Sequence, residues 1–204
     1  MRTPRLKPVG GARPKGDTVP MTIAVQSDVG FFSTLFQSIA ADLAMIMDAE
    51  VSFGQPRVDR ETERRAGADQ VHISFRFLVH HDGKDHHGSA LVPLADAITL
   101  AGHLMMMGPE DLEEARQATD LDRTMKEAML EVGNFIAGAI DAVIRTWYPA
   151  GATCRSVGCQ GVRADVRPAF PYEEGDPIVV GATEAKVASN PPYTIIVQLP
   201  PPPG

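Results

Sequence analysis

Apolar residues recur at spacings of three and four along residues 27–47, which is the period of a helix with one buried face. The recurring positions are Val29, Phe32, Leu35, Phe36, Ile39, Leu43 and Ile46. Ser27 and Asp28, at the start of this run, are residue types that cap helices well. The pattern therefore predicts a capped helix over these residues, followed by a short strand at residues 51–53 and a turn at 54–56.

Strict alternation replaces the helical period at residues 71–80. Large apolar residues occupy every second position of this stretch: Val71, Ile73, Phe75, Phe77 and Val79. Such alternation predicts a strand with one buried face. Asp82-Gly83 is a strong hairpin-turn signal, so a second strand is expected at about residues 87–92. The charged residues 59–69 are expected to form a loop.

Two more helices and two more strands complete the predicted domain. Pro93 suits the first turn of a helix that stops near Gly108, and a strongly marked helix runs from Asp122 to Trp147. The acidic linker between them, residues 111–119, is expected to be a loop or a weak helix. Stretches rich in Val and Ile predict two late strands, at residues 177–183 and 193–199. Segregated helices and strands of this kind indicate an α+β domain, an antiparallel sheet with long helices packed on it.

The two ends of the chain differ from its middle. Residues 1–20 are rich in proline and glycine and hold almost no large apolar residues. We therefore expect a disordered extension over residues 1–22, a single domain over residues 23–199 and a disordered tail over residues 200–204.

Composition excludes several classes of partner. Hydrophobic residues make up 44% of the 204 residues, which is enough for one globular core. The net charge of -7 argues against nucleic acid and against an anionic membrane surface, because both require a basic footprint. No run of about 18 apolar residues is present, so no membrane-spanning helix is expected.

The two cysteines, Cys154 and Cys159, do not form a CxxC pair, and no second pair of metal ligands accompanies them. We interpret them as ordinary thiols, with a short-loop disulfide or a redox switch as the alternative. Low cysteine usage suits a reducing cytosol, so we expect a cytoplasmic protein.

The strongest helix carries a polar stripe. Glu127, Glu131, Asn134 and Gly138 lie at positions i, i+4, i+7 and i+11 and therefore share one side of the helix. The other side suits a core, with Met125, Met129, Val132, Ile136, Ile140 and Val143. Glycine in mid-helix costs roughly 1 kcal/mol relative to alanine. Close approach of another backbone is the simplest feature that would offset this at Gly133 and Gly138.

From periodicity alone, we interpret the stripe as a solvated helix face, because Glu-x-x-Asn by itself is a weak pattern. The segment Glu-Val-Gly-Asn-Phe-Ile-Ala-Gly-Ala at residues 131–139, however, resembles the signature of the CheC/CheX/FliY family of chemotaxis phosphatases. That signature has Glu, two residues, Asn and then an Ala-Gly step. The surroundings are also similar: a first helix that leads to Gly54-Gln55-Pro56, a hairpin, a helix that ends in Met107-Gly108, and an acidic linker. The likeness covers about residues 25–145.

The resemblance implies a CheC/CheX-like fold and, because only one Glu-x-x-Asn helix is evident, a protein of the CheX type. It implies hydrolysis of the aspartyl phosphate of a CheY-like response regulator, in chemotaxis or two-component signalling. Asn134 would position the attacking water, and Glu131 would pair with the regulator's lysine. Glu127, where the family often has Asp or Ser, and Gly138 would be weaker docking residues.

The same resemblance implies no cofactor in this chain, with Mg²⁺ bound in the partner regulator instead. It leaves open a homodimer, which strand contacts help to form in CheX-type members. A second hypothesis keeps the fold but not the catalysis: a non-catalytic adaptor or flagellar-switch-like module that docks a regulator. A third is a metal sensor, because His80, His81, His86 and His87 crowd one turn; the alternative there is a solvated turn.

Overall fold

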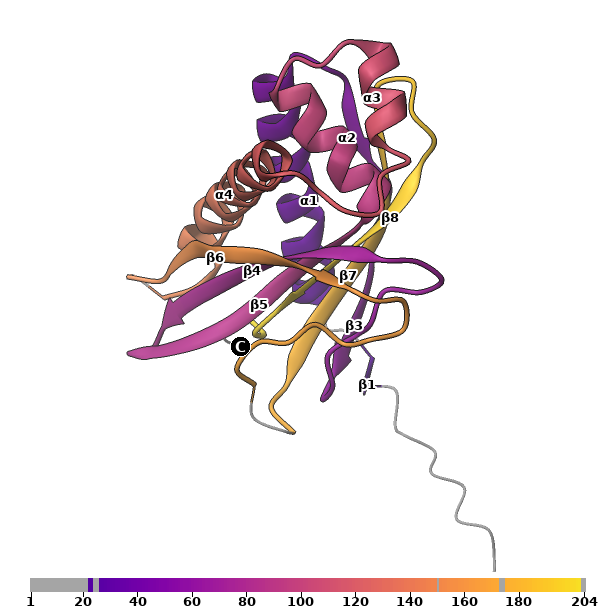
Figure 1. The fold of residues 1–204 in the computed structure, drawn as a ribbon. Coiled ribbons are helices and arrows are strands. Elements are labelled where there is room, and N and C mark those ends of the chain that lie inside the picture. Colours follow the sequence, from indigo (N-terminus) through magenta and orange to yellow (C-terminus); the bar gives the residue numbers. More distant parts are fainter. Residues whose placement is uncertain (1–21, 24–25, 150, 173–174, 203–204) are drawn as a thin grey trace, which may run out of the picture.

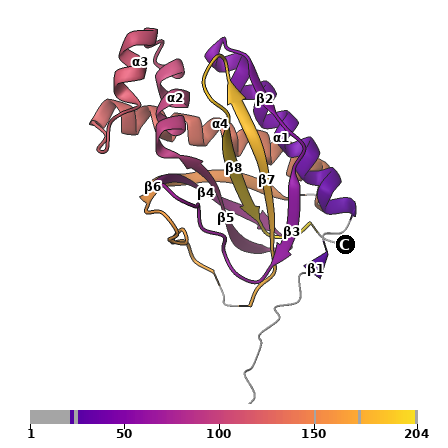
Figure 2. The same cartoon turned by 90° about the vertical axis from the view of Figure 1, so that its right-hand side faces the viewer.

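The computed structural model describes residues 22–23, 26–149, 151–172 and 175–202, which form one eight-stranded antiparallel sheet with helices on one face (Figures 1 and 2). The strands are β1 (Thr22–Ile23), β2 (Val51–Phe53), β3 (Arg57–Glu61), β4 (His72–His81), β5 (Lys84–Pro93), β6 (Thr153–Val162), β7 (Ile178–Val187) and β8 (Tyr193–Leu199). Their order across the sheet is β1-β3-β7-β8-β5-β4-β6, and β2 also pairs with β7.

The helices are α1 (Gln26–Met47), α2 (Leu94–Leu104), α3 (Pro109–Ala115) and α4 (Arg123–Trp147). In Figure 1, α1, α2 and α4 share one side of the sheet and α3 lies beside α2. The predicted α+β class, an antiparallel sheet with long helices packed on it, is confirmed. The first and last helices begin within one residue of their predicted starts.

The apolar stripes of α1 and α4 form the centre of the core. All six core residues predicted for α4 are at most 7% exposed. In α1 the prediction holds for most positions, but Val29 is 40% exposed and Phe31, at 0%, fills the core instead. The rings of Phe31 and Trp147 meet edge-on with centroids 5.8 Å apart, which joins the start of α1 to the end of α4.

Helix α1 is long and apolar enough to cross a membrane by length and composition alone. Its largest apolar side chains, among them Phe32, Leu35 and Ile39, are completely buried in the domain core. The fold itself therefore accounts for the apolar face of this helix.

The outer face of the sheet is also covered, and the prediction of one solvated face for β4 was wrong. Residues 62–71 and 163–172 lie over this face, where Leu91, Phe170, Ile178, Val180 and Ile196 form a second, smaller core. His72 and Ser74, on the face expected to be polar, are therefore buried. Alternation shows which residues share a face, but it does not show that a distant loop will cover the second face.

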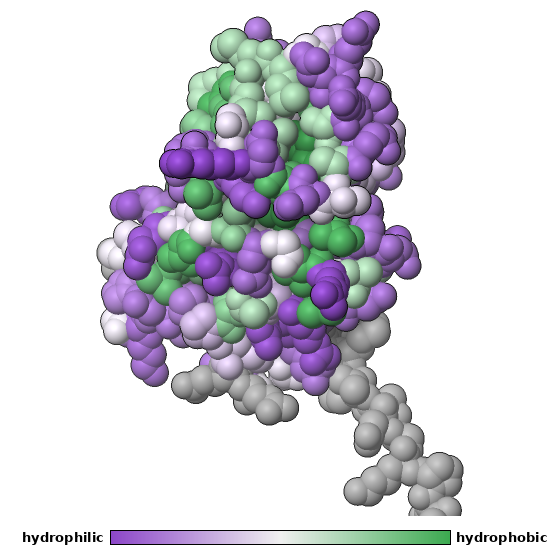
Figure 3. Space-filling view, viewed as in Figure 1, coloured by the Kyte–Doolittle hydropathy of each residue, from purple (hydrophilic) through white to green (hydrophobic). Residues whose placement is uncertain are grey.

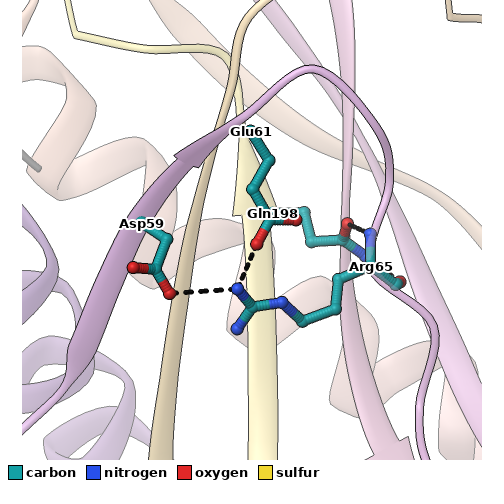
Figure 4. Close-up of polar contacts among 4 residues, drawn as sticks. All are labelled: Asp59, Glu61, Arg65 and Gln198. Atoms are coloured by element: carbon teal, nitrogen blue, oxygen red, sulfur yellow. Dashed lines mark hydrogen bonds and ion pairs between the residues drawn. The ribbon is translucent and has the colours of Figure 1, made fainter. Parts of the chain in front are cut away.

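Gln198 of β8 anchors the loop that follows β3. The backbone N–H of Arg65 donates to Gln198 Oε1 over 2.6 Å, and Gln198 Nε2 donates to the Arg65 carbonyl over 3.1 Å (Figure 4). The Arg65 guanidinium in turn pairs with Asp59 and Glu61 of β3. The loop that follows β3 is thus tied to both β8 and β3.

One long strand was missed by the sequence analysis. The ten-residue strand β6 carries few large apolar residues and two glycines, so it shows no clear alternation. It forms because its backbone pairs with β4 from Thr153↔His80 to Val162↔His72. Several boundaries also moved: residues 59–61 belong to β3 rather than to the following loop, β5 begins at Lys84, α2 ends at Leu104, and β7 continues to Val187. A short helix, α3, forms at the acidic linker, where a loop or a weak helix was expected.

The predicted disordered ends fall mostly outside the described residues, which leave out residues 1–21 and 203–204. Thr22, placed in the predicted extension, lies in β1 and pairs with Arg60 of β3. Pro200, placed in the predicted tail, is buried, and its carbonyl accepts a hydrogen bond from Tyr148 Oη over 2.7 Å. The ordered domain therefore extends past residue 199.

Asp28 lies inside the first turn of α1 rather than before it, and it faces Arg60 of β3. Arg60 Nε and Nη2 donate to the two carboxylate oxygens over 2.6 and 3.0 Å, and Asp28 is 0% exposed. Arg60→Met is expected to lower the free energy of unfolding by about 3 kcal/mol, because it removes the guanidinium that faces a buried carboxylate. Urea unfolding measures this change.

Arg167→Met is the matched control for that measurement. Arg167 pairs with Glu63 where both side chains are more than half exposed. Loss of such a solvent-screened pair is expected to change stability by less than about 1 kcal/mol. Equal losses in the two variants would contradict a structural role for the Arg60–Asp28 pair.

Candidate functional site

Helix α4 is fixed at its start and near its end. The Asp122 side chain caps the helix by accepting a hydrogen bond from the backbone N–H of Met125 over 2.7 Å. Asp141 accepts a hydrogen bond from the backbone N–H of Cys154 over 2.7 Å, which ties the helix to the first residues of β6. The direction in which each α4 side chain points is therefore set by the fold.

Gly133 lets α4 pack closely on the sheet. A Cβ atom at this position would lie 3.1 Å from Phe75 Cδ1 and 3.5 Å from Ser156 Oγ. The close approach expected at this glycine is therefore present, but side chains of β4 and β6 make it rather than another backbone.

The predicted polar stripe is exposed along its whole length. Glu127, Glu131, Asn134 and Gly138 are all exposed, while the opposite side of α4 is in the core. Asn134 Nδ2 donates a hydrogen bond to Glu131 Oε2 over 3.3 Å. The structure thus places a carboxylate and an amide one turn apart, in mutual contact and accessible to a partner.

The two carboxylates of the stripe have different surroundings. Glu127 accepts a hydrogen bond from Arg123 Nε over 2.7 Å, in a pair that solvent screens because the Arg123 side chain is 91% exposed. Among the residues that the structure describes, no Lys or Arg lies within ion-pair distance of Glu131. Glu131 therefore offers one negative charge without a cation of its own.

Leu130, which the sequence pattern had not singled out, is 41% exposed on the same side of α4. It lies three positions after Glu127 and four before Asn134, so helical spacing alone could have placed it in the stripe. An exposed leucine next to the Glu131–Asn134 pair adds an apolar contact point to a polar site.

The stripe lies on an open helix surface rather than in a cavity. Hollows of about 590, 760 and 490 Å³ occur elsewhere in the described chain, and no residue of α4 lines any of them. The largest is lined by the loops at residues 61–66 and 165–167. An exposed helix surface cannot enclose a small substrate, but its side chains can enter a pocket of another protein.

The histidine-rich turn between β4 and β5 does not gather metal ligands. Within the described residues, no three His, Cys, Asp or Glu side chains are arranged to hold an ion. His80 Nδ1 lies 2.8 Å from Asp85 Oδ1, and the rings of His81 and His86 stack with centroids 4.2 Å apart. Burial lowers the pKa of His86, and the charge of His81 lowers it further. The described geometry therefore gives the metal-sensor hypothesis no support.

Cys154 and Cys159 are both free thiols on strand β6. Burial raises the pKa of each thiol, which keeps both protonated and weakly nucleophilic near neutral pH. At about 3.3 Å per residue, five strand positions separate their Cα atoms by roughly 16 Å, too far for a disulfide bond between them.

No protein-family model and no curated protein sequence matches the chain. Solved structures match most of its length. FliY from Thermotoga maritima has a TM-score of 0.62 at 13% identity, with 88% of this chain and 92% of that chain covered. The FliM middle domain from H. pylori has a TM-score of 0.60 at 8% identity, with 87% and 94% covered. The chemotaxis protein CheX from Desulfovibrio desulfuricans has a TM-score of 0.54 at 16% identity, with 83% and 98% covered.

The chain therefore has the fold of the CheC/CheX/FliY proteins, which the FliM middle domain shares. The fold expected from residues 131–139 and their surroundings is confirmed. At these identities the likeness concerns the fold, and the chemistry of the site has to be argued from its own residues.

Proposed function

We propose that this chain is a cytoplasmic protein phosphatase that hydrolyses the aspartyl phosphate of a CheY-like response regulator, in chemotaxis or another two-component pathway. The observation that carries the proposal is the exposed, hydrogen-bonded Glu131–Asn134 pair on a fixed helix of this fold. An amide suits the task of placing a water, because it donates and accepts hydrogen bonds without changing its charge. The resemblance of residues 131–139 to the family signature supports the same assignment.

In the proposed mechanism Asn134 enters the regulator's active site. Its Nδ2 is held by Glu131, which leaves Oδ1 to accept a hydrogen bond from the attacking water. The water oxygen then points at phosphorus, opposite the aspartate oxygen that leaves. A P–O bond forms to the water, the P–O bond to the aspartate breaks, and the water's proton passes to the phosphate product. Catalysis on this account comes from positioning rather than from a strong base.

Glu131 supplies the second interaction. Its carboxylate pairs with the lysine of the regulator's active site and holds Asn134 at the right depth. Mg²⁺ bound in the regulator neutralises the phosphoryl group, so this chain contributes no cofactor of its own. Glu127 and Gly138 contact the regulator at either end of the pair. A homodimer formed through strand contacts, as in CheX-type proteins, is part of the same proposal.

The direct test adds the purified chain to each phosphorylated receiver domain encoded in the same genome. For at least one receiver, loss of the aspartyl phosphate is expected to be faster than the receiver's own rate, and chelation of Mg²⁺ is expected to remove the acceleration. If every receiver keeps its phosphate as long as it does alone, the phosphatase proposal is wrong.

A non-catalytic adaptor is the second candidate, and the FliM likeness favours it. One H. pylori FliM structure that shares this fold is a complex with FliG, and another is a complex with SpeE. An adaptor of this kind would bind a receiver without shortening the life of its phosphate. Measuring binding and phosphate loss on the same receiver separates the two candidates.

A further inference from the structure

A hollow of about 490 Å³ lies where the start of α2, the stretch after α3 and the start of β8 come together. These three elements are seen together in Figure 2. Asp96, Arg116 and Tyr193 line the hollow, and so does His72, the first residue of β4. Pockets of roughly 300–1,000 Å³ hold small molecules, whose orientation is fixed by a few convergent polar groups. The polar groups of this hollow therefore decide what it can hold.

Three of the polar side chains that line this hollow are buried. His72, Asp96 and Tyr193 are 5%, 8% and 8% exposed. A buried polar atom costs free energy unless a hydrogen bond satisfies it, so such atoms are normally paired. Any hydrogen-bonding capacity that these side chains leave unfilled is therefore capacity for a bound group.

Each of the three side chains keeps an atom that can accept a further hydrogen bond. Asp96 accepts from Arg116 Nη1 at Oδ1, over 3.3 Å, and its Oδ2 has no partner in the described part of the chain. His72 Nδ1 lies 2.9 Å from the Gln70 carbonyl oxygen, so it carries the proton and leaves Nε2 as an acceptor. The buried Tyr193 Oη has no hydrogen-bond partner among the residues that the structure describes.

Arg116 does not satisfy these acceptors. Its Nη1 donates to the Ala95 carbonyl over 3.1 Å, to Asp96 Oδ1 and to Thr99 Oγ1. These bonds join the end of α3 to the first turns of α2. The guanidinium thus has a structural role, and the second oxygen of Asp96 is left for another group.

The three buried side chains lie close enough to act on one another. Burial raises the pKa of Asp96, Arg116 lowers it in part, and a charge on His72 lowers it further. Burial also raises the pKa of Tyr193, and the charge of Asp96 adds to that rise. Each of these electrostatic effects requires the two groups to be near neighbours. One bound group can therefore meet all three.

The rim of the hollow is acidic. Asp69 and Glu184 line its exposed edge, and neither makes an ion pair within the described residues. Helix α3, which ends just before Arg116, carries four carboxylates and no Lys or Arg. Figure 3 shows a hydrophilic flank over α3, at the upper right of the molecule. A field of this sign draws cations toward the hollow.

We propose that this hollow binds a small aliphatic amine, whose ammonium group donates hydrogen bonds to Asp96 Oδ2, His72 Nε2 and Tyr193 Oη. An ammonium group has three N–H donors and no acceptor, which matches a site with unfilled acceptors. A metal ion does not match it, because no three His, Cys, Asp or Glu side chains of the described chain are arranged to hold one. The methylene groups of the amine lie against the prolines that line the hollow, at residues 93, 191 and 192. The inference is independent of the proposed phosphatase activity, since no residue of α4 lines the hollow.

NMR titration of the full chain with three five-carbon probes tests the site. Cadaverine, a diamine, is expected to shift the amide signals of residues 69–72, 95–96 and 193–194 with a dissociation constant of about 1 mM or lower. Glutarate, the dicarboxylate of the same length, is expected to shift none of them. The zwitterion δ-aminovalerate distinguishes two sources of the ligand. Tighter binding than cadaverine assigns an amino acid whose carboxylate meets Arg116, and weaker binding assigns a diamine or polyamine.

Tyr193→Phe separates binding from stability. Loss of a buried hydroxyl that has no partner is expected to leave the thermal unfolding midpoint of the ligand-free chain unchanged or higher. The dissociation constant for cadaverine is expected to rise about tenfold, because one hydrogen bond to a charged group is lost. Tyr148→Phe is the matched control, since its buried hydroxyl donates to the Pro200 carbonyl. There the midpoint is expected to fall while the affinity for cadaverine stays the same.

Asp96→Asn tests the charge of the site. Asparagine keeps an oxygen for Arg116 but removes the carboxylate that faces the ammonium group, so affinity is expected to fall at least about tenfold. Glu184→Gln, at the exposed rim, is expected to weaken binding only about twofold, because solvent screens that charge. Equal shifts with glutarate and cadaverine, or shifts spread along α3 instead of at the hollow, would overturn the proposal. Unchanged affinity in Tyr193→Phe and Asp96→Asn would overturn it as well.

Discussion

Asn134→Ala is expected to abolish the acceleration of regulator dephosphorylation, so that phosphate loss returns to the regulator's own rate. The amide is the one group proposed to hold the attacking water, and a misplaced reacting group loses a factor of about 100 or more. Binding is expected to change by less than about tenfold, because a single neutral hydrogen bond contributes only about 1 kcal/mol. Phosphate loss at saturating chain and calorimetry with the activated regulator measure the two quantities.

Gln55→Ala is the matched control, since it removes an exposed amide from the turn between β2 and β3. Its phosphatase rate and its affinity are expected to equal those of the unsubstituted chain. Full acceleration by Asn134→Ala would remove the amide from the mechanism. Loss of binding together with rate would instead assign Asn134 to docking.

Glu131→Gln is expected to act on affinity rather than on the rate at saturation. Glutamine keeps an oxygen that can accept the Asn134 hydrogen bond, so the amide stays oriented, but it removes the charge that faces the regulator's lysine. Loss of one partner of such an interfacial charge pair costs about 2 kcal/mol or more, which weakens binding roughly thirtyfold. The dependence of the initial rate on regulator concentration should show a raised KM and a nearly unchanged kcat.

Glu113→Gln is the control for charge alone, because Glu113 is an exposed carboxylate on α3, outside the polar stripe of α4. It is expected to leave KM unchanged. Glu131→Ala, which removes both the charge and the oxygen that holds Asn134, is expected to lower kcat as well. An unchanged KM in Glu131→Gln would contradict pairing with a lysine.

Much of the fold could be predicted because its longest elements have strong periodicity. The helix from Asp122 to Trp147 was placed to within a residue, since its apolar side is continuous and its cap is a good one. The Asp82-Gly83 turn lies where expected, with positive φ angles of 51° and 71° that suit a two-residue hairpin turn. Strand β6 was not predicted from the sequence, because its backbone pairing with β4, rather than its own residue pattern, makes it a strand.

In the candidate site, too, local spacing predicted part of the arrangement and the tertiary structure decided the rest. Helical spacing placed Glu131, Asn134 and Gly138 on one stripe, and the structure confirms that the stripe is exposed. Spacing placed Gly138 on the stripe and Gly133 off it, but it could not show which residues of the sheet Gly133 meets. Only the position of the sheet makes one of them a packing contact and leaves the other open.

The sequence by itself determined the class of fold, the helix that bears the site and the identity of the residues along its exposed stripe, because these depend on local period and residue type. The tertiary structure alone decided that the sheet is covered on both faces, that Glu131 has no cation partner in the described residues and that open space surrounds Gly138. Those properties depend on residues far apart in the chain, such as Arg65 with Gln198 and Gly133 with Phe75, whose proximity no local pattern encodes.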